Sequence, residues 1–244
     1  MHHFFLGPPC IQENLVIFPF AVSKQIRRVL RLKEDGLVMV LDNAGNQYLT
    51  RLEFGPDMDV IGHVESVQPA RGESEVESWI YLSLSQREKM EWVLQKGTEL
   101  GMTGLVPVIS QRSLVQDARV TEKKRERWER ILKEAAEQCH RGHIPDLGRT
   151  LSFDKALTDA NERVDVVLIA SVTEGAQSFR SVLQASAGKR YAVFIGPEGG
   201  FSPEEVKAAL AMGCIPVSMG ERVLRMETAA ITAVALIQYE LSKE

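Results

Sequence analysis

Two glycine-containing loops carry the residue types and the spacing that could do chemistry. The segment Gly196 to Gly200 reads Gly-Pro-Glu-Gly-Gly and follows an apolar stretch, and the segment Met219 to Glu227 contains Arg225. Glycines let a ligand approach the backbone closely. An arginine can stabilise negative charge, and a carboxylate near it can accept a proton. The alternative interpretations are tight turns for the glycines and a helix cap for Arg225 and Glu227.

The order of residues in the glycine loop excludes two common nucleotide motifs. It breaks the Gly-x-Gly-x-x-Gly spacing of dinucleotide sites, and no Lys-Ser or Lys-Thr follows it as in a P-loop. The carboxylate of Glu198 would repel phosphates, so the loop favours a cationic or hydroxyl-bearing ligand.

Alternating strands and helices after residue 70 position these loops. Their order predicts a parallel sheet covered by helices, and ligands bind beyond the carboxyl ends of the strands in such sheets. We therefore expect both loops at one site. The strands are predicted at 79–84, 105–109, 164–170, 191–195 and 215–218, and the helices at 89–100, at 122–139, from Ser202 onward and at 228–241.

The last predicted helix, 228–241, has almost no polar face. A helix that is apolar all round is buried all round, so we expect it between layers or against a second subunit. The first seventy residues instead contain short apolar runs with turn residues at 43–46, which predict β-strands and a hairpin. A helical stretch is predicted around 24–32, and the expected domains are 1–70 and 71–244.

The charge balance restricts any nucleic-acid site to a local patch. The chain carries 29 basic and 33 acidic side chains, a formal charge of -4. Residues 24–33 contain no acid, so this window is the predicted phosphate-binding patch, although Val29 and Leu30 within it also look like core residues. Its cations are Lys24, Arg27, Arg28, Arg31 and Lys33.

Cysteine and histidine usage predicts neither disulfides nor a metal. Three scattered cysteines favour a reducing, cytoplasmic compartment. The segment Cys139 to His143 matches no common zinc spacing. The start of the chain lacks the pattern of a signal peptide, and no stretch is long enough to cross a membrane.

The chain resembles the bacterial ribosomal RNA small subunit methyltransferase E family, which belongs to the SPOUT class. The matching segments follow the family's order over nearly the whole chain. They are 28–31, 96–101 (Lys-Gly-Thr-Glu-Leu-Gly), 111–113, 137–138 with Arg141 and 144–145, 195–200, and 222–229.

The resemblance implies a fold, an activity and partners. The fold would be α/β, with an N-terminal PUA-like β-barrel domain and a C-terminal SPOUT-type domain that contains a trefoil knot. The activity would be S-adenosylmethionine-dependent methylation of N3 of one uridine in the 16S rRNA of the small ribosomal subunit, by a homodimer that uses no metal.

The resemblance also assigns site residues. It places Arg112 and Arg141 near the RNA, and it leaves two departures, since the family often has His where Gln25 stands and Thr where Met226 stands. The cofactor pocket would be formed mainly by backbone groups of three loops, which contain Ala170, Ser171, Gly196, Pro197, Glu198, Gly199, Gly200, Met219, Gly220, Val223 and Leu224.

N3 of uracil carries a proton, and its loss spreads negative charge onto the neighbouring carbonyl oxygens. We expect Arg225 to stabilise that charge, and Glu227 either to accept the proton or to hold Arg225 in place. Two other classes remain as alternatives. A nucleotide-dependent oxidoreductase would need a motif that is missing, and a non-catalytic RNA-binding module would not need the segment Arg225 to Thr228.

Overall fold

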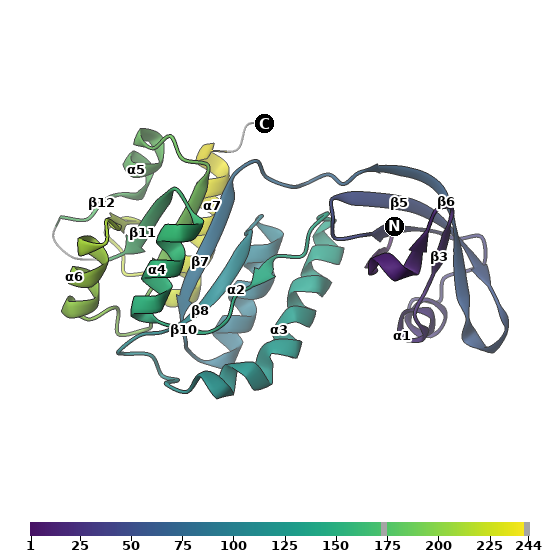
Figure 1. The fold of residues 1–244 in the computed structure, drawn as a ribbon, viewed down its shortest axis with the longest axis horizontal. Helices are drawn as coiled ribbons and strands as arrows, with labels where there is room; N and C mark the ends of the chain where they lie inside the picture. Colours follow the sequence, from purple (N-terminus) through teal and green to yellow (C-terminus); the bar gives the residue numbers. More distant parts are fainter. Residues whose placement is uncertain (172–174, 242–244) are drawn as a thin grey trace. The chain divides into compact units, whose positions relative to one another are not determined.

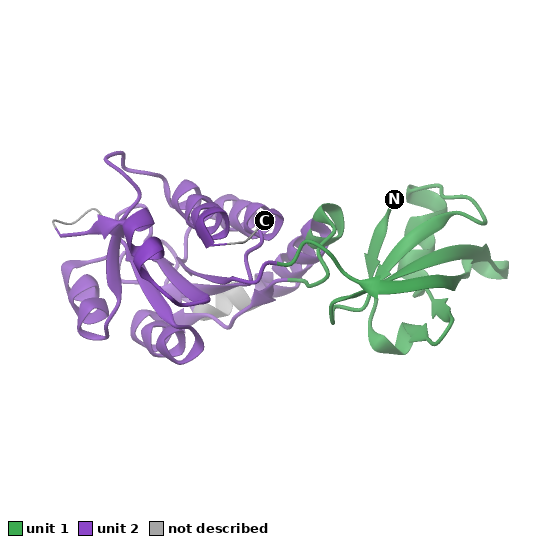
Figure 2. Cartoon of the chain, turned by 90° about the horizontal axis from the view of Figure 1, so that it is seen from above, with its two compact units in different colours: residues 1–73, 136–144 green, residues 74–135, 145–244 purple. Residues whose placement is uncertain are grey.

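The computed structural model describes residues 1–171 and 175–241, apart from the side chains of 118–122. It divides into two compact units, which are coloured separately in Figure 2. Unit 1 comprises residues 1–73 and 136–144, and unit 2 comprises residues 74–135 and 145–244. The chain therefore enters the first unit twice, a feature that the predicted boundary at residue 70 did not contain.

Unit 1 is built on one six-stranded sheet in the order β1-β4-β5-β6-β3-β2, in which β1 pairs in parallel with β4 and the other pairs are antiparallel. The predicted hairpin at 43–46 is confirmed, since Asn43 and Gly45 both have positive φ between β4 and β5. The strands are β1 (His3–Phe5), β2 (Ile11–Gln12), β3 (Leu15–Ile17), β4 (Leu37–Leu41), β5 (Asn46–Phe54) and β6 (Val60–Pro69).

A short helical segment covers the apolar core of this sheet. It consists of α1 (Phe20–Lys24) and the π-helix η2 (Gln25–Val29). The unit also contains the turns η1 (Pro8–Cys10) and η3 (Pro56–Met58), of which η3 packs beside α1. Leu30 packs against the core, but Val29 is 71% exposed, so its prediction as a core residue is wrong. The wider π-turn, in which Leu30 N–H donates to Gln25 O, brings Leu30 to the buried side instead.

Two carboxylates hold residues 136–144 against the rest of unit 1. Glu137 Oε1 accepts a hydrogen bond from Phe5 N–H at 2.9 Å. Glu73 accepts from the backbone of Gly142 at 2.9 Å and forms an ion pair with Arg141 at 2.8 Å. An apolar cluster that includes Phe5, Leu41, Ala136, Ala70 and Ile144 completes this attachment.

Unit 2 contains a parallel sheet in the order β10-β8-β7-β13-β11-β14-β12, with β9 against β8. This arrangement confirms the predicted parallel α/β organisation. The strands are β7 (Glu77–Ser83), β8 (Gly104–Ile109), β9 (Asp146–Leu147), β10 (Leu151–Ser152), β11 (Val166–Ala170), β12 (Gln177–Ser178), β13 (Arg190–Ile195) and β14 (Ile215–Ser218).

Helices cover both faces of this sheet (Figure 1). α4 packs against β8, β10, β11 and α6 on one face, whereas α7 packs against β7 and β13 with α2 and α5 beside it. The helices are α2 (Arg87–Glu99), α3 (Ala118–Cys139), α4 (Phe153–Arg163), α5 (Phe179–Ala185), α6 (Pro203–Ala211) and α7 (Met226–Leu241). Within the described residues, no helix is both long and apolar enough to cross a membrane.

α7 is buried along only one side within a single chain. Its buried residues are Met226, Ala230, Ala233, Val234 and Ile237, which recur at helical spacing. The opposite side is partly or fully open: Thr232 and Ala235 are half-buried, and Tyr239 is 82% exposed. The expected all-round burial is therefore not reached within one chain.

Candidate functional site

Three loops meet because their strands are neighbours. β13, β11 and β14 lie side by side and run in the same direction, so the residues that follow Ile195, Ala170 and Ser218 emerge at one edge of the sheet. On the other side of β13, the parallel sheet continues with β7 and then β8. The two loops that the sequence singled out are thus brought together by strand order rather than by sequence proximity.

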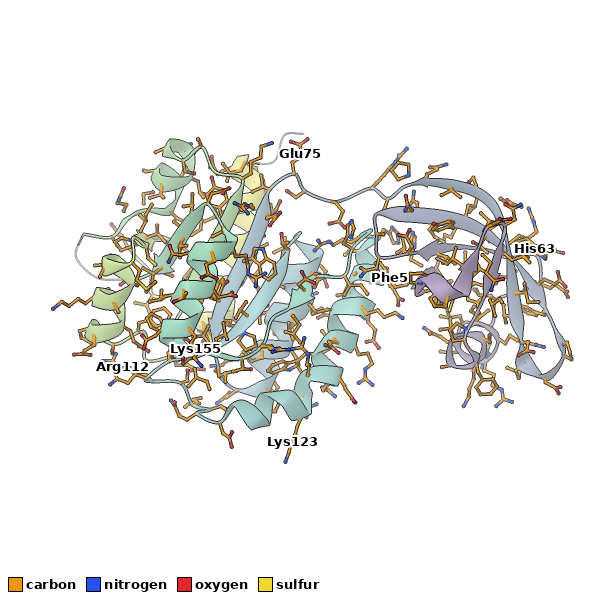
Figure 3. All side chains as sticks on the ribbon, in the orientation of Figure 1. Phe5, His63, Glu75, Arg112, Lys123 and Lys155 are labelled. Atoms are coloured by element: carbon orange, nitrogen blue, oxygen red, sulfur yellow. The ribbon has the colours of Figure 1, made fainter. Side chains whose placement is uncertain are left out.

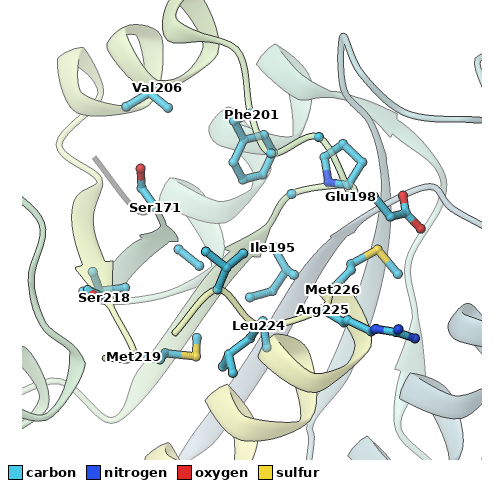
Figure 4. A pocket seen from close by; sticks show the side chains of 18 of the residues that line it. Ser171, Ile195, Glu198, Phe201, Val206, Ser218, Met219, Leu224, Arg225 and Met226 are labelled. Carbon is cyan, nitrogen blue, oxygen red and sulfur yellow. The ribbon is translucent and has the colours of Figure 1, made fainter. Parts of the chain in front are cut away.

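These loops enclose a pocket of about 910 Å³ in unit 2 (Figure 4). All eleven residues expected to hold a cofactor line it, together with Arg112 and Arg225. Its apolar wall was not predicted. That wall contains Ile195, Phe201, Val206, Leu210 and Val217.

The glycine loop is compact, and at Gly196 it leaves no room for a side chain. Gly200 N–H donates to Pro197 O at 2.8 Å, and Gly200 has a φ of +67°. A Cβ on Gly196 would lie 3.2 Å from Phe201 N and 3.3 Å from Gly200 C, where backbone atoms cannot easily move. This shape fits a ligand that is held close to the main chain.

The predicted start of α6 is confirmed and fixes the end of this loop. Ser202 accepts a hydrogen bond from Glu205 N–H while the Glu205 carboxylate accepts from Ser202 N–H, which is a complete capping box. The other carboxylate oxygen of Glu205 accepts from Gln111 N–H at 2.7 Å. Arg112, labelled in Figure 3, donates to Gly199 O at 2.7 Å. The loop after β8 therefore supports the glycine loop.

Glu198 presents a carboxylate at the pocket. Its Oε1 accepts hydrogen bonds from Ser85 Oγ at 2.5 Å and from Lys89 Nζ at 2.6 Å. Burial raises the pKa of this carboxyl, but the bonds from Lys89 and Ser85 outweigh burial, so the pKa lies below its usual range. Glu198 is therefore ionised at neutral pH, so its carboxylate can attract a cationic group of a ligand.

Arg225 and Glu227 differ in position. Arg225 is exposed, lines the pocket and accepts the Ala229 N–H at its carbonyl in the first turn of α7. Glu227 does not line the pocket, and its buried Oε2 has no hydrogen-bond partner among the described residues. Figure 4 shows Met226 and Arg225 on the same side of the pocket as Glu198.

The pocket is strongly cationic although the chain is acidic. Glu198 is the only acid among the described lining residues, and it is paired with Lys89. Sequence reasoning missed the cations at 89 and 207, because they lie on different helices and no linear motif connects them, whereas Arg222 belongs to the predicted second loop. The full cationic set is Lys89, Arg112, Lys207, Arg222 and Arg225.

The remaining residues predicted to contact RNA belong to unit 1. Lys24, Arg28 and Arg31 are exposed. Arg27 is half-buried and donates to Gly55 O at 3.0 Å. The Arg141 side chain is only 7% exposed in its ion pair with Glu73, so this placement favours a structural role. In the described part of the chain, no group of three or more His, Cys, Asp or Glu could hold a metal ion.

A family model described as an RNA methyltransferase domain matches residues 72–238. The chain belongs to this family. Among its relatives, the ribosomal RNA small subunit methyltransferase E of Bacillus subtilis is 36% identical over 171 residues, which cover 68% of this chain and 66% of that protein. The protein of the same name from Synechocystis is 29% identical over 235 residues, with 95% of this chain and 75% of that protein covered.

Solved structures of methyltransferases have the same fold. The ribosomal RNA small subunit methyltransferase E from Neisseria gonorrhoeae, bound to S-adenosyl methionine, has a TM-score of 0.87 at 27% identity, covering 98% of this chain and 97% of its own. A protein from Legionella pneumophila in complex with the bound cofactor SAM has a TM-score of 0.86 at 30% identity, covering 97% of this chain and 96% of its own. Both units of this RNA methyltransferase are therefore represented in its structural relatives.

Proposed function

We propose that this ribosomal RNA methyltransferase transfers the methyl group of S-adenosylmethionine to N3 of one uridine in the 16S rRNA of the small ribosomal subunit. The observation that carries this proposal is the junction of three strand-end loops in a glycine-lined pocket whose other charged side chains are cations. Family membership and relatives that bear the ribosomal RNA small subunit methyltransferase E name support the reaction and the RNA.

The pocket fits S-adenosylmethionine in size and chemistry. Its glycines allow close backbone contact, its apolar wall can cover an adenine ring, and the ionised Glu198 can attract a positive charge. When bound, the cofactor supplies an electrophilic methyl group on a sulfonium. The residues that would hold it are Ala170, Ser171, Gly196 to Gly200, Met219, Gly220, Val223 and Leu224.

Arg225 prepares N3 of the uracil to act as the nucleophile. As the N3 proton passes to water, negative charge spreads onto the carbonyl oxygens, and a guanidinium at the pocket stabilises it. Glu227 lies outside the pocket lining, so we assign it a positioning role in the first turn of α7, next to the backbone that carries Arg225. Lys207 and Arg222 add positive charge for the phosphates around the target.

We also propose the finer features of the family for this chain. They are a PUA-like barrel in unit 1, a trefoil knot in unit 2, and a cytoplasmic homodimer that pairs through α7. The insertion of β13 between β7 and β11, and the return of α7 from β14 to β7, support a threaded topology. The half-open apolar side of α7 supports the dimer.

The deciding experiment maps N3-methyluridine in 16S rRNA from cells that lack the protein, and then supplies the purified chain with S-adenosylmethionine to small subunits from those cells. We expect one modification to be missing and then restored. An intact modification in the deficient cells would overturn the proposal. A thermal-shift assay tests the oxidoreductase alternative, because NAD would stabilise such an enzyme. A non-catalytic RNA-binding module would instead bind RNA without methyl transfer.

A further inference from the structure

The outward face of α1 and η2 exposes an aromatic and an aliphatic side chain among cations. Phe20 is 65% exposed and Val29 is 71% exposed, and Lys24 and Arg28 are exposed between them. Large apolar groups are normally buried on such a short amphipathic helix. We call these four residues, together with the exposed Gln25, the platform.

The platform is a face of the helix and not a frayed end. Ile26 is fully buried in the core of unit 1, and the buried Ser23 donates from Oγ to Phe18 O at 3.1 Å. Residues four or five apart along α1 and η2 share a side, so Phe20, Lys24 and Arg28 all lie opposite the buried contacts. The platform is therefore held in place without any partner.

The charge around the platform is positive. Lys24, Arg28, Arg31 and Lys33 are exposed, and none has an ion pair among the described residues. Arg27 is used internally, because it donates to Gly55 O and lies 4.8 Å from the centroid of the Phe54 ring. The exposed acids in this region are Asp57 in η3, which packs beside α1, Asp59, whose carbonyl accepts a hydrogen bond from Arg27, and Glu34 and Asp35 after the window.

We propose that the platform binds unpaired nucleotides of the RNA substrate, with a base stacked on Phe20 and flanking phosphates held by Lys24 and Arg28. An aromatic ring set among cations is the combination that single-stranded nucleic acids recognise. In duplex RNA the base faces are already stacked, so the platform selects single-stranded segments. This inference rests on the proposed function, since it names the part of the RNA that unit 1 contacts.

Anionic membranes are the competing partner for an exposed phenylalanine among cations. The apolar part of the platform comprises only Phe20 and Val29 on a ten-residue helical segment. This is a small apolar face for insertion at a membrane surface, whereas one ring suffices to stack a base. The residues on this face thus favour RNA.

The test compares binding of the full-length protein to a single-stranded oligouridine and to a duplex RNA of equal length, by fluorescence anisotropy over a range of salt. Phe20→Ala should weaken single-strand binding roughly 5- to 100-fold at every salt concentration, with little effect on duplex binding. Arg28→Ala should instead reduce the slope of log affinity against log salt by about 0.7. Phe20→Tyr should retain binding.

Val67→Ala is the matched control, because Val67 is 53% exposed on β6 of the same unit. Unchanged single-strand binding by Phe20→Ala, or an equal loss of affinity for Val67→Ala, would overturn the proposed role of the platform. Loss of binding to phosphatidylglycerol vesicles by Phe20→Ala, with RNA binding intact, would assign the surface to membranes and also overturn it. Failure of the wild-type protein to methylate small subunits, with the binding pattern intact, would overturn the proposed function alone.

Discussion

Arg225 and Glu227 are two positions apart in the chain, but only Arg225 lines the pocket. A guanidinium at the pocket can meet a carbonyl oxygen of a bound pyrimidine, whereas a carboxylate with a buried oxygen in the first turn of α7 is placed to support the helix start. Spacing alone left two roles open for Glu227, and the geometry favours positioning.

Removal of the Arg225 guanidinium should therefore affect the reaction more than binding. We expect Arg225→Ala to lower the single-turnover methylation rate roughly 100-fold, since the developing charge loses its donor. The affinity for S-adenosylhomocysteine, measured by calorimetry, should be nearly unchanged. Glu227→Gln should lower the rate without removing a titration from the pH–rate profile, as loss of a general base would.

Arg190→Ala is the control for Arg225→Ala. Arg190 forms an ion pair with Asp165 at 2.6 Å, at the amino end of β13 and thus at the opposite end of the strand from the pocket. The single-turnover methylation rate of Arg190→Ala should match that of the wild type. An unchanged rate for Arg225→Ala would remove Arg225 from the mechanism.

Gly196 tests whether the pocket depends on its bare backbone. The Cβ in Gly196→Ala would crowd Phe201 N and Gly200 C, so the loop must shift and the affinity for S-adenosylmethionine should fall roughly 10-fold or more, as measured by calorimetry. Gly213→Ala is the control, because Gly213, unlike Gly196, has positive φ, so alanine strains the backbone there, but it lies in the turn after α6 with open space around it. Equal affinity losses in both variants would indicate general backbone strain.

Some site residues could be predicted and others could not, for physical reasons. The glycine loop and Arg225 lie in short segments with unusual composition, so the sequence singled them out, and both line the pocket. Lys89 and Lys207 are ordinary helix residues in the sequence, and only the packing of α2 and α6 beside the glycine loop brings them to the pocket. Arg141 stays a predicted RNA contact, and its ion pair with Glu73 was not predicted, because nothing local indicates a partner 68 positions away.

At the level of elements, a carboxylate connects α2 to α3. Glu91 accepts hydrogen bonds from Arg127 at 2.6 and 2.8 Å and from Arg87 at 2.7 Å. The Arg127 guanidinium is the main cause that lowers the pKa of Glu91 to about 2, against an opposing effect of burial. The folded state therefore prefers the ionised carboxylate more strongly than the unfolded chain does.

This preference predicts a pH dependence of stability. Because the pKa of Glu91 is depressed on folding, its stabilisation is complete above about pH 5 and is lost as the pH falls toward 2. Glu91→Gln should lower the Tm by about 2–4 °C at pH 7 and by much less near pH 2. Thermal melts of both proteins across this range provide the measurement, and a constant difference in Tm would contradict the ion-pair explanation. Glu88→Gln, on the exposed side of α2, is the control.

The boundaries of most elements were predictable because apolar periodicity and turn chemistry act locally. The strands at 105–109 and 191–195 and the capped helix after Ser202 required only their own residues. The π-helix η2 was not predicted, since its wider turn arises from packing of Ile26 and Leu30 against the core of unit 1. Local patterns therefore identify elements better than they identify which side faces inward.

At the level of the whole molecule, the sequence carries little information about strand order. Chain order alone would place β13 after β11 at an edge, yet β13 lies between β7 and β11. Likewise, residues 136–144 comprise the last turn of α3 and the segment after it, and they belong to unit 1 although the rest of α3 belongs to unit 2. Such long-range placements depend on which apolar faces meet, and neither periodicity nor the predicted boundary at residue 70 contained them.

The half-open side of α7 leads to a prediction about assembly. Thr228 and Tyr239 are exposed there, and Thr232 and Ala235 are half-buried between them. A face of small residues and one tyrosine lets two helices approach closely, and a charge placed within it would be buried without a partner. We therefore expect Ala235→Arg to raise the dimer dissociation constant roughly 100-fold or more without a large change in the Tm of the monomer.

Sedimentation velocity over a range of concentrations measures this effect. The matched control is Ala187→Arg, which introduces the same charge at an exposed position in the loop before β13. The wild type and the control should sediment with the mass of two chains, and Ala235→Arg with the mass of one. Because α7 begins next to Arg225 and packs against the strand that ends in the glycine loop, loss of the dimer should also reduce methylation. A dimer that survives Ala235→Arg would place the interface on another surface.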